Sequence, residues 1–148
     1  MLDRNTAYIQ NAHRHSLNKV SKNVKEVHSG MLFHLDDNEE WDYADGTRIS
    51  YPTLNERYPG KGLGPQGERL EGRDNVSSTG KLACLLGNFE IGVDTYEKGA
   101  TYKVGRPLAA SSTTKGYLKP AEDGEKFIVG YVTHVPEDDN DFLRYHRA

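Results

Sequence analysis

The stretch that decides the fold runs from residue 101 to residue 135 and reads TYKVGRPLAASSTTKGYLKPAEDGEKFIVGYVTHV. Short β-forming runs alternate in it with glycine, proline, serine and aspartate, and polar turns are expected at 111–116 and 123–124. The most apolar run of the chain, residues 127–132, closes it, and Gly130 within that run allows close packing or a bend. The pattern predicts an antiparallel meander that scaffolds a small β-barrel or sandwich.

Further short runs before and after this stretch are also predicted to be strands. Residues 30–35 form a mostly apolar run, residues 88–94 alternate between apolar and other side chains, and Trp41 and Tyr43 suit a short returning strand. Residues 81–86 are apolar on both faces, as in a central strand, and Gly87 is expected to end it. The side chains expected to share buried faces are Met31, Phe33 and Leu35 in one run and Phe89, Ile91 and Val93 in another. With a last strand near residues 141–146, the chain is predicted to be all-β.

The composition predicts one domain with extended parts outside its core. The chain has 148 residues, of which 35% are hydrophobic, and its mean hydropathy is −0.79. That is a small supply of core residues for this length. We therefore predict an N-terminal arm over residues 1–28 and a β-barrel domain over residues 29–148. The domain would contain a long loop at about 46–80, which is rich in glycine and proline and has almost no periodicity.

Charge is distributed unevenly between the predicted arm and the predicted body. Residues 1–28 contain five bases and two acids (5 − 2 = +3), which leaves 14 bases and 20 acids in the other 120 residues (14 − 20 = −6). A basic arm of this kind is either an interaction device or a solvated tail, and it is either extended or a short helix. The acidic body argues against direct binding of nucleic acid.

The sequence contains no long apolar run and no recognisable leader. A membrane span needs about 18 consecutive apolar residues, and no run approaches that length. The first five residues lack the apolar core of a signal peptide. The single cysteine, Cys84, lies in an apolar run where a buried thiol is expected. These features predict synthesis in a cytoplasm and no membrane association.

The motifs do not predict a metal site, a cofactor or an enzyme. Residues 36–40 resemble a calcium loop in composition, but Trp41 stands where an EF-hand needs glycine, so a solvated turn is expected. His13 and His15 have no partner ligands at suitable spacing. The run before Gly80-Lys81 lacks the first glycine of a phosphate loop, and no Gly-x-Ser-x-Gly elbow is present.

Three segments resemble the head decoration, or capsid cement, proteins of tailed bacteriophages. They read TYKVGRPL at 101–108, GYLKP at 116–120 and EKFIVGYVT at 125–133. Proteins of this family often show a strand, a glycine-proline break, a hairpin and a strand that ends near Ile-Val-Gly-x-Val. Residues 30–35 and 81–93 could supply the preceding strands of a similar barrel, so the resemblance covers about half of the chain.

The resemblance implies a non-enzymatic virion protein that binds the outer surface of an assembled capsid and stabilises it against internal DNA pressure. Its expected partners are the major capsid protein and neighbouring copies of itself, as a trimer, a dimer or separate monomers. Attachment is expected through the basic arm and the long loop. The residues expected to contact the capsid are Arg4, Arg14, Lys19, Tyr51, Tyr58 and Leu63.

A second hypothesis is a carbohydrate- or receptor-binding β-module of a phage head fibre or tail. Aromatic side chains can stack on sugars when they are exposed. The candidates in this chain are Trp41, Tyr43, Tyr51 and Tyr58. The alternative role for the same side chains is to anchor the long loop on the body of the protein.

Overall fold

The protein is all-β. A computed structural model describes residues 13–15, 18–55, 62–63, 69–70 and 82–148, and no helix occurs among them, so none of this part could cross a membrane as a helix. In chain order the strands are β1 (His13–His15), β2 (Leu32–Leu35), β3 (Trp41–Tyr43), β4 (Tyr51–Pro52), β5 (Gly62–Leu63), β6 (Arg69–Leu70), β7 (Cys84–Gly87), β8 (Phe89–Val93), β9 (Pro107–Ala110), β10 (Leu118–Pro120), β11 (Gly130–His134) and β12 (Leu143–Arg147).

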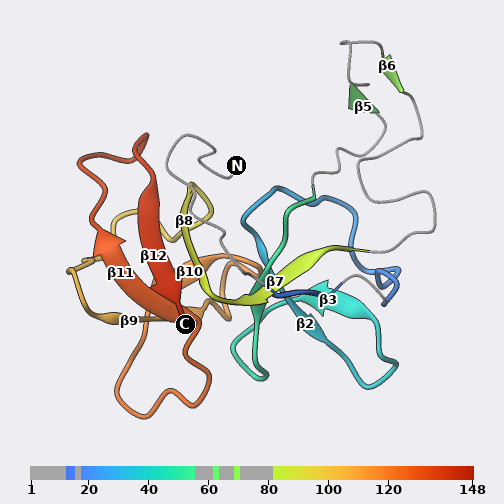
Figure 1. Ribbon diagram of the computed structural model, residues 1–148, viewed down its shortest axis with the longest axis horizontal. Helices are drawn as coiled ribbons and strands as arrows, with labels where there is room; N and C mark the ends of the chain where they lie inside the picture. The colour runs from blue at the N-terminus through green and yellow to red at the C-terminus, as the bar shows by residue number, and fades with distance from the viewer. Residues whose placement is uncertain (1–12, 16–17, 56–61, 64–68, 71–81) are drawn as a thin grey trace.

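The first sheet has five antiparallel strands in the order β10-β9-β11-β12-β8 (Figure 1). A parallel bridge between Tyr96 and Leu118 ties its two edges together. Leu118 N–H donates to the Thr95 carbonyl (3.0 Å), and Glu97 N–H donates to the Leu118 carbonyl (2.8 Å). The sheet is therefore rolled, but its edge strands do not pair along their length, so the barrel stays open.

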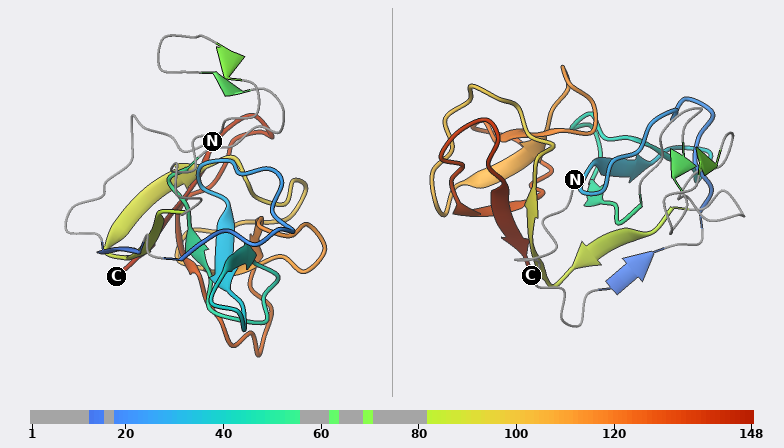
Figure 2. Two further views of the ribbon diagram at one scale, coloured as in Figure 1. Left: turned by 90° about the vertical axis from the view of Figure 1, so that its right-hand side faces the viewer. Right: turned by 90° about the horizontal axis from the view of Figure 1, so that it is seen from above.

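The second sheet contains the strands β3-β2-β4, and its hydrogen bonding continues into β7 and β1. The bridge between Thr53 and Cys84 makes this link, and Leu54 N–H donates to the Ala83 carbonyl (3.0 Å). Strands β7 and β8 follow each other around Asn88, whose φ of 57° lies in the left-handed region that asparagine tolerates. The chain passes from one sheet to the other at this bend, so the two sheets form a sandwich-like arrangement (Figure 2).

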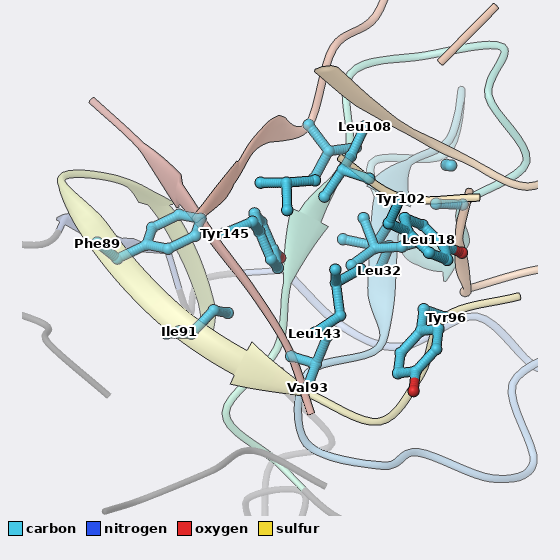
Figure 3. Close-up of a cluster of buried hydrophobic side chains, with 14 of the residues drawn as sticks. Leu32, Phe89, Ile91, Val93, Tyr96, Tyr102, Leu108, Leu118, Leu143 and Tyr145 are labelled. Atoms are coloured by element: carbon cyan, nitrogen blue, oxygen red, sulfur yellow. The ribbon is translucent and has the colours of Figure 1, made fainter. Parts of the chain in front are cut away.

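The larger hydrophobic core lies inside the rolled first sheet and is closed by side chains of the second (Figure 3). Phe89, Ile91 and Val93 alternate inward on β8 with at most 3% of each exposed, as predicted. The Phe89 and Tyr145 rings meet edge to face at 5.7 Å. Leu32 of β2 enters this core from the second sheet.

The smaller core covers the other face of the second sheet. The alternation in β2 puts Met31 and Phe33 into this core with Leu35 packed against it, which confirms the predicted shared face. Val24 and Val27 close the core from outside, with 2% and 0% of each exposed.

A segment of the predicted arm belongs to the packed body. Besides Val24 and Val27, residues 19–21 are bonded to β3: Ser21 N–H donates to the Trp41 carbonyl (2.9 Å), and Trp41 N–H donates to that of Lys19 (2.8 Å). Residues 18–28 are thus fixed against the second sheet. The remainder of the predicted arm, apart from the backbone of β1, lies outside the described residues.

The stretch 101–135 forms strands, but it is not a simple meander. β9 pairs with β10 on one side and with β11 on the other, so β11 does not follow β10 in the sheet. The run 100–104 is not a strand, because the chain turns at Gly105 (φ 81°). The closing strand begins at Gly130, where a Cβ atom would lie 2.5 Å from the His146 carbonyl oxygen, and this confirms the predicted close packing.

Candidate interaction surfaces

The six residues expected to contact a capsid are described to different extents. Arg4 and Tyr58 lie outside the described residues. Arg14 on β1 and Leu63 on β5 are described by their backbone alone. Lys19 is exposed, and Tyr51 is half-buried.

Three of these residues are distributed across the second sheet, from one edge to the other. Arg14 lies on β1, which pairs with β7 as the outermost strand, and it is the register partner of Leu85. Tyr51 lies on β4, opposite Phe33 of β2. Lys19 lies beside β3 at the other edge. The strands β5 and β6, which pair with each other, project on the same side of the molecule as this sheet (Figure 1).

The Tyr51 ring is held by two neighbours within the protein. It meets Trp41 edge to face, with ring centroids 5.9 Å apart, and the Arg147 guanidinium lies 5.4 Å from its centroid. A cation over an aromatic face is attracted by the negative face of the ring. These contacts fix the side chain in one place on the sheet.

Arg147 joins the two sheets through hydrogen bonds to three backbone carbonyls. Its Nε donates to Val129 (2.6 Å), next to β11, while Nη1 donates to Leu86 (3.2 Å) and Nη2 to Ser50 (2.7 Å) in the second sheet. The aromatic ring of Phe89 lies 5.9 Å away. Burial lowers the pKa of the guanidinium from its usual value, yet arginine stays charged at any ordinary pH. Arg147 is therefore a latch between the sheets.

The acidic runs that resemble a calcium loop are turns stabilised by their own hydrogen bonds. Asp36 Oδ1 accepts from the N–H groups of Asn38 (2.8 Å) and Glu40 (3.0 Å) in the turn between β2 and β3. Asp37 pairs with Arg48 at 2.7 Å. The solvated turn predicted for residues 36–40 is confirmed. Among the residues that the structure describes, no three His, Cys, Asp or Glu side chains gather as metal ligands would.

Cys84 and His134 both have structural surroundings. Cys84 is fully buried, as predicted, and burial raises the pKa of its thiol strongly. His134 Nε2 lies 3.0 Å from Asp141 Oδ2, and the same carboxylate oxygen accepts from Glu137 N–H (3.0 Å). This pair fixes the link between β11 and β12.

Two of the aromatic residues considered for sugar stacking are used in packing instead. Trp41 is fully buried in the smaller core. The Tyr43 hydroxyl donates to the Glu26 carbonyl (2.6 Å) and accepts from Glu26 N–H (3.1 Å), which holds residues 24–27 against the sheet. Trp41 is therefore not exposed for stacking, whereas the Tyr43 ring stays half-buried while its hydroxyl holds the segment before β2.

An open groove of about 630 Å³ lies between the turn at Gly46 and Thr47 and the loop of residues 122–127. Its walls carry three carboxylates and one free-standing aromatic side chain, Phe127, which is half-buried. Lys119 on β10 holds the loop by an ion pair to Glu125 at 2.7 Å. The groove is therefore a fixed, acidic depression.

The outer face of the first sheet carries an exposed pair of rings. Tyr131 on β11 and His146 on β12 are register partners, and their ring centroids are 6.0 Å apart with a tilt of 35° between the planes. Tyr131 is 44% exposed, and His146 is exposed as well. Most large apolar or aromatic side chains that the structure describes are covered, so this pair is a distinct surface feature.

A fixed set of polar groups lies beside the two rings. Glu90 on β8 is the register partner of His146. Its Oε1 accepts from Thr133 Oγ1 (3.0 Å) and from Arg144 Nη2 (3.0 Å). Thr133 takes this position because the register between β11 and β12 shifts around it, and such a bulge re-aims a side chain.

On the other side of Tyr131, the turn between residues 103 and 106 is pinned to β11. Gly105 N–H donates to the Val132 carbonyl (2.8 Å), and Val132 N–H donates to that of Arg106 (3.0 Å). The turn displays Val104 with 69% of the residue exposed. Sequence reasoning missed this turn, the ring pair and the polar set, because only the strand register brings them together.

No family model matches this chain. No curated protein matches it either.

Proposed function

We propose that this protein is a non-enzymatic virion component that binds the outer surface of an assembled bacteriophage capsid and stabilises it. The resemblance of residues 101–108, 116–120 and 125–133 to capsid cement proteins supports this proposal. These segments contain the first half of β9, the whole of β10 and most of β11, which are three neighbouring strands of the first sheet. The partners would be the major capsid protein and neighbouring copies of the chain.

The main structural support for the proposal is that extended segments are attached to the second sheet. A basic N-terminal segment supplies an outermost strand, β1, and the paired strands β5 and β6 project on the same side (Figure 1). Extended segments of this kind bind by adding strands and filling pockets on a neighbour. We assign attachment to this side of the molecule, with Arg14, Lys19 and Tyr51 on the sheet itself.

Charge and lattice geometry add to this assignment. The +3 charge of residues 1–28 suits an acidic capsid surface, whereas the rest of the chain carries −6. On a lattice, one copy can touch several capsid subunits at once, so modest contacts combine into firm attachment. Any ligand that binds only the assembled state stabilises that state by mass action.

Co-sedimentation with undecorated capsids tests the proposal. Purified protein is mixed with capsids of the virus whose genome encodes it, and the bound copies per capsid are measured over a range of concentrations. Saturable binding at or below roughly micromolar concentration is expected. Failure to co-sediment at any concentration in that range would rule out capsid attachment.

A truncated chain locates the attachment site. Removal of residues 1–12 deletes Arg4 but keeps every described residue, so the fold should persist while capsid affinity falls. The matched control is Lys103→Ala, which removes an exposed base from the first sheet's side of the molecule. Equal affinity of the truncated and full-length proteins would remove the N-terminal segment from the attachment surface.

A further inference from the structure

The outer face of the first sheet has the elements of a small-ligand site, and capsid attachment through the second sheet does not use them. The two sheets occupy opposite halves of the molecule in Figure 1. We propose that this face binds a carbohydrate, through stacking of a sugar ring on Tyr131 and His146 and through hydrogen bonds that its hydroxyls donate to Glu90 and accept from Arg144.

The two rings are neighbours in one row of residues that crosses the sheet. Register pairs run across four strands from Pro107 on β9 through Tyr131 and His146 to Glu90 on β8, so these residues form one row. At the usual spacing of about 4.8 Å between neighbouring strands, the row is roughly 14 Å long. The planes of the two rings are tilted by 35° to each other. A pyranose ring presents a flat apolar face of C–H groups, and that face packs on an aromatic ring.

The polar groups beside the rings are of the type that binds sugar hydroxyls. A carboxylate accepts two hydrogen bonds side by side, and a guanidinium donates two in the same fork geometry. Glu90 and Arg144 have 33% and 31% of their side chains exposed, so each reaches solvent while their mutual bond at 3.0 Å fixes both. The Thr133 hydroxyl holds the carboxylate from a third direction. The groups are therefore oriented before a ligand arrives, which lowers the entropy lost on binding.

The size and charge of the face favour a sugar over larger partners. A stable protein interface buries about 800 Å² on each partner. Tyr131, at 44% exposed, offers on the order of 100 Å²; the groups on its His146 side are polar, and Val104 is exposed on the other side. A single-stranded nucleic acid also stacks on aromatic rings and needs a cationic groove. Beside the rings Arg144 is paired with Glu90, while the exposed bases Lys103 and Arg106 lie in the turn on the other side of Tyr131, so a nucleic acid is included in the test below.

A nuclear magnetic resonance titration tests this inference. The ¹⁵N-labelled full chain is titrated with tetrasaccharides of glucose, galactose, mannose and N-acetylglucosamine, each to roughly 10 mM, since weak single sites fall in the millimolar range. At least one saccharide should shift amide signals of β8, β11 and β12. Tyr131→Ala and Glu90→Gln should each weaken that binding by at least about tenfold, whereas Tyr131→Phe should retain most of it.

The matched control is Ile49→Ala, because Ile49 is also exposed (50%) but lies outside the row. Its affinity for the saccharide should equal that of the unchanged protein. The absence of any shift with all four saccharides would overturn the inference, as would shifts elsewhere or binding that Tyr131→Ala leaves intact. A hexathymidine that titrates the same signals in place of every sugar would also overturn it. Loss of capsid binding in any of these variants is a separate readout and bears only on the proposed function.

Discussion

Replacement of Arg147 by methionine should destabilise the protein more than any surface substitution. Methionine has a similar length and fits the space beside Tyr51 and Phe89, but it cannot donate to the three carbonyls that the guanidinium binds at 2.6–3.2 Å. An unsatisfied buried acceptor costs about 1–3 kcal/mol, so three cost roughly 3–9 kcal/mol in total. Two effects offset several kcal/mol of this loss: the variant no longer has to remove a cation from water on folding, and it buries the apolar methionine side chain instead.

The expected net loss is therefore about 3 kcal/mol of the free energy of unfolding. For a chain of this size that corresponds to a fall in Tm of roughly 6–12 °C. Urea unfolding followed by circular dichroism measures the free energy, and Arg147→Lys should lie between the two proteins because an ammonium keeps the charge but loses the fork.

Arg106→Met is the matched control, since Arg106 is exposed and its change should alter stability by less than about 0.5 kcal/mol. If Arg147→Met unfolds within about 0.5 kcal/mol of the unchanged protein, the two sheets do not depend on this latch, and the reasoning is refuted.

Three other predictions concern packing, reactivity and pH. Gly130→Ala should lower the free energy of unfolding by about 2–3 kcal/mol, because its Cβ would lie 2.5 Å from the His146 carbonyl oxygen and 2.7 Å from the Tyr145 ring. Gly87→Ala is the control, since its nearest contact would be at 3.6 Å, and equal urea midpoints for the two variants would contradict the predicted clash. Cys84 should react with a thiol reagent at pH 8 at least about 100-fold more slowly in the native protein than in urea, since burial disfavours the thiolate, and fast native labelling would show that the smaller core opens. The pKa of Asp141 is lowered by hydrogen bonds from Glu137 N–H, His134 and Phe142 N–H, so its contribution to stability is present above the usual pKa of 3.8 and is lost as the pH falls through the lower folded value. The difference in urea midpoint between the unchanged protein and Asp141→Asn should therefore shrink between pH 5 and pH 2. A difference that stays constant over this range would refute the stabilising role of the ionised Asp141 carboxylate.

The sequence predicts the strands whose burial alternates, because local side-chain pattern alone determines them. The inward face of β8 and the face shared by Met31, Phe33 and Leu35 are of this kind. The turn chemistry also predicts that residues 36–40 form a turn. The side-chain pattern does not predict the strand order. β9 pairs with both β10 and β11, so these two strands are not neighbours in the sheet although they follow each other in the sequence.

Local side-chain pattern also misleads where a turn interrupts an alternating run. The alternating run 100–104 looks like a strand, but Tyr102 is buried with its hydroxyl donating to the Glu97 carbonyl (2.8 Å), and the chain then turns at Gly105. The bend between β7 and β8 falls at Asn88, because asparagine also adopts positive φ, and not at Gly87.

The candidate surfaces were predicted less completely than the fold. From the sequence, Trp41 and Tyr43 are candidates for contact with a ligand. In the structure residues 19–27 pack against them, and this tertiary contact cannot be predicted from local pattern. Tyr131 and His146 are 15 positions apart and meet only through the register of β11 with β12. Arg147 donates to backbone carbonyls, and because every residue has one, no sequence pattern identifies these acceptors.

The most direct test of the central proposal is the effect of the protein on the stability of undecorated capsids. Capsids are saturated with purified protein, and the temperature at which they release their DNA is measured with a fluorescent DNA dye. The account predicts saturable binding and a higher release temperature, because a ligand of the assembled state stabilises that state. Capsids that bind no protein, or that bind it and release DNA at an unchanged temperature, would contradict a cement function.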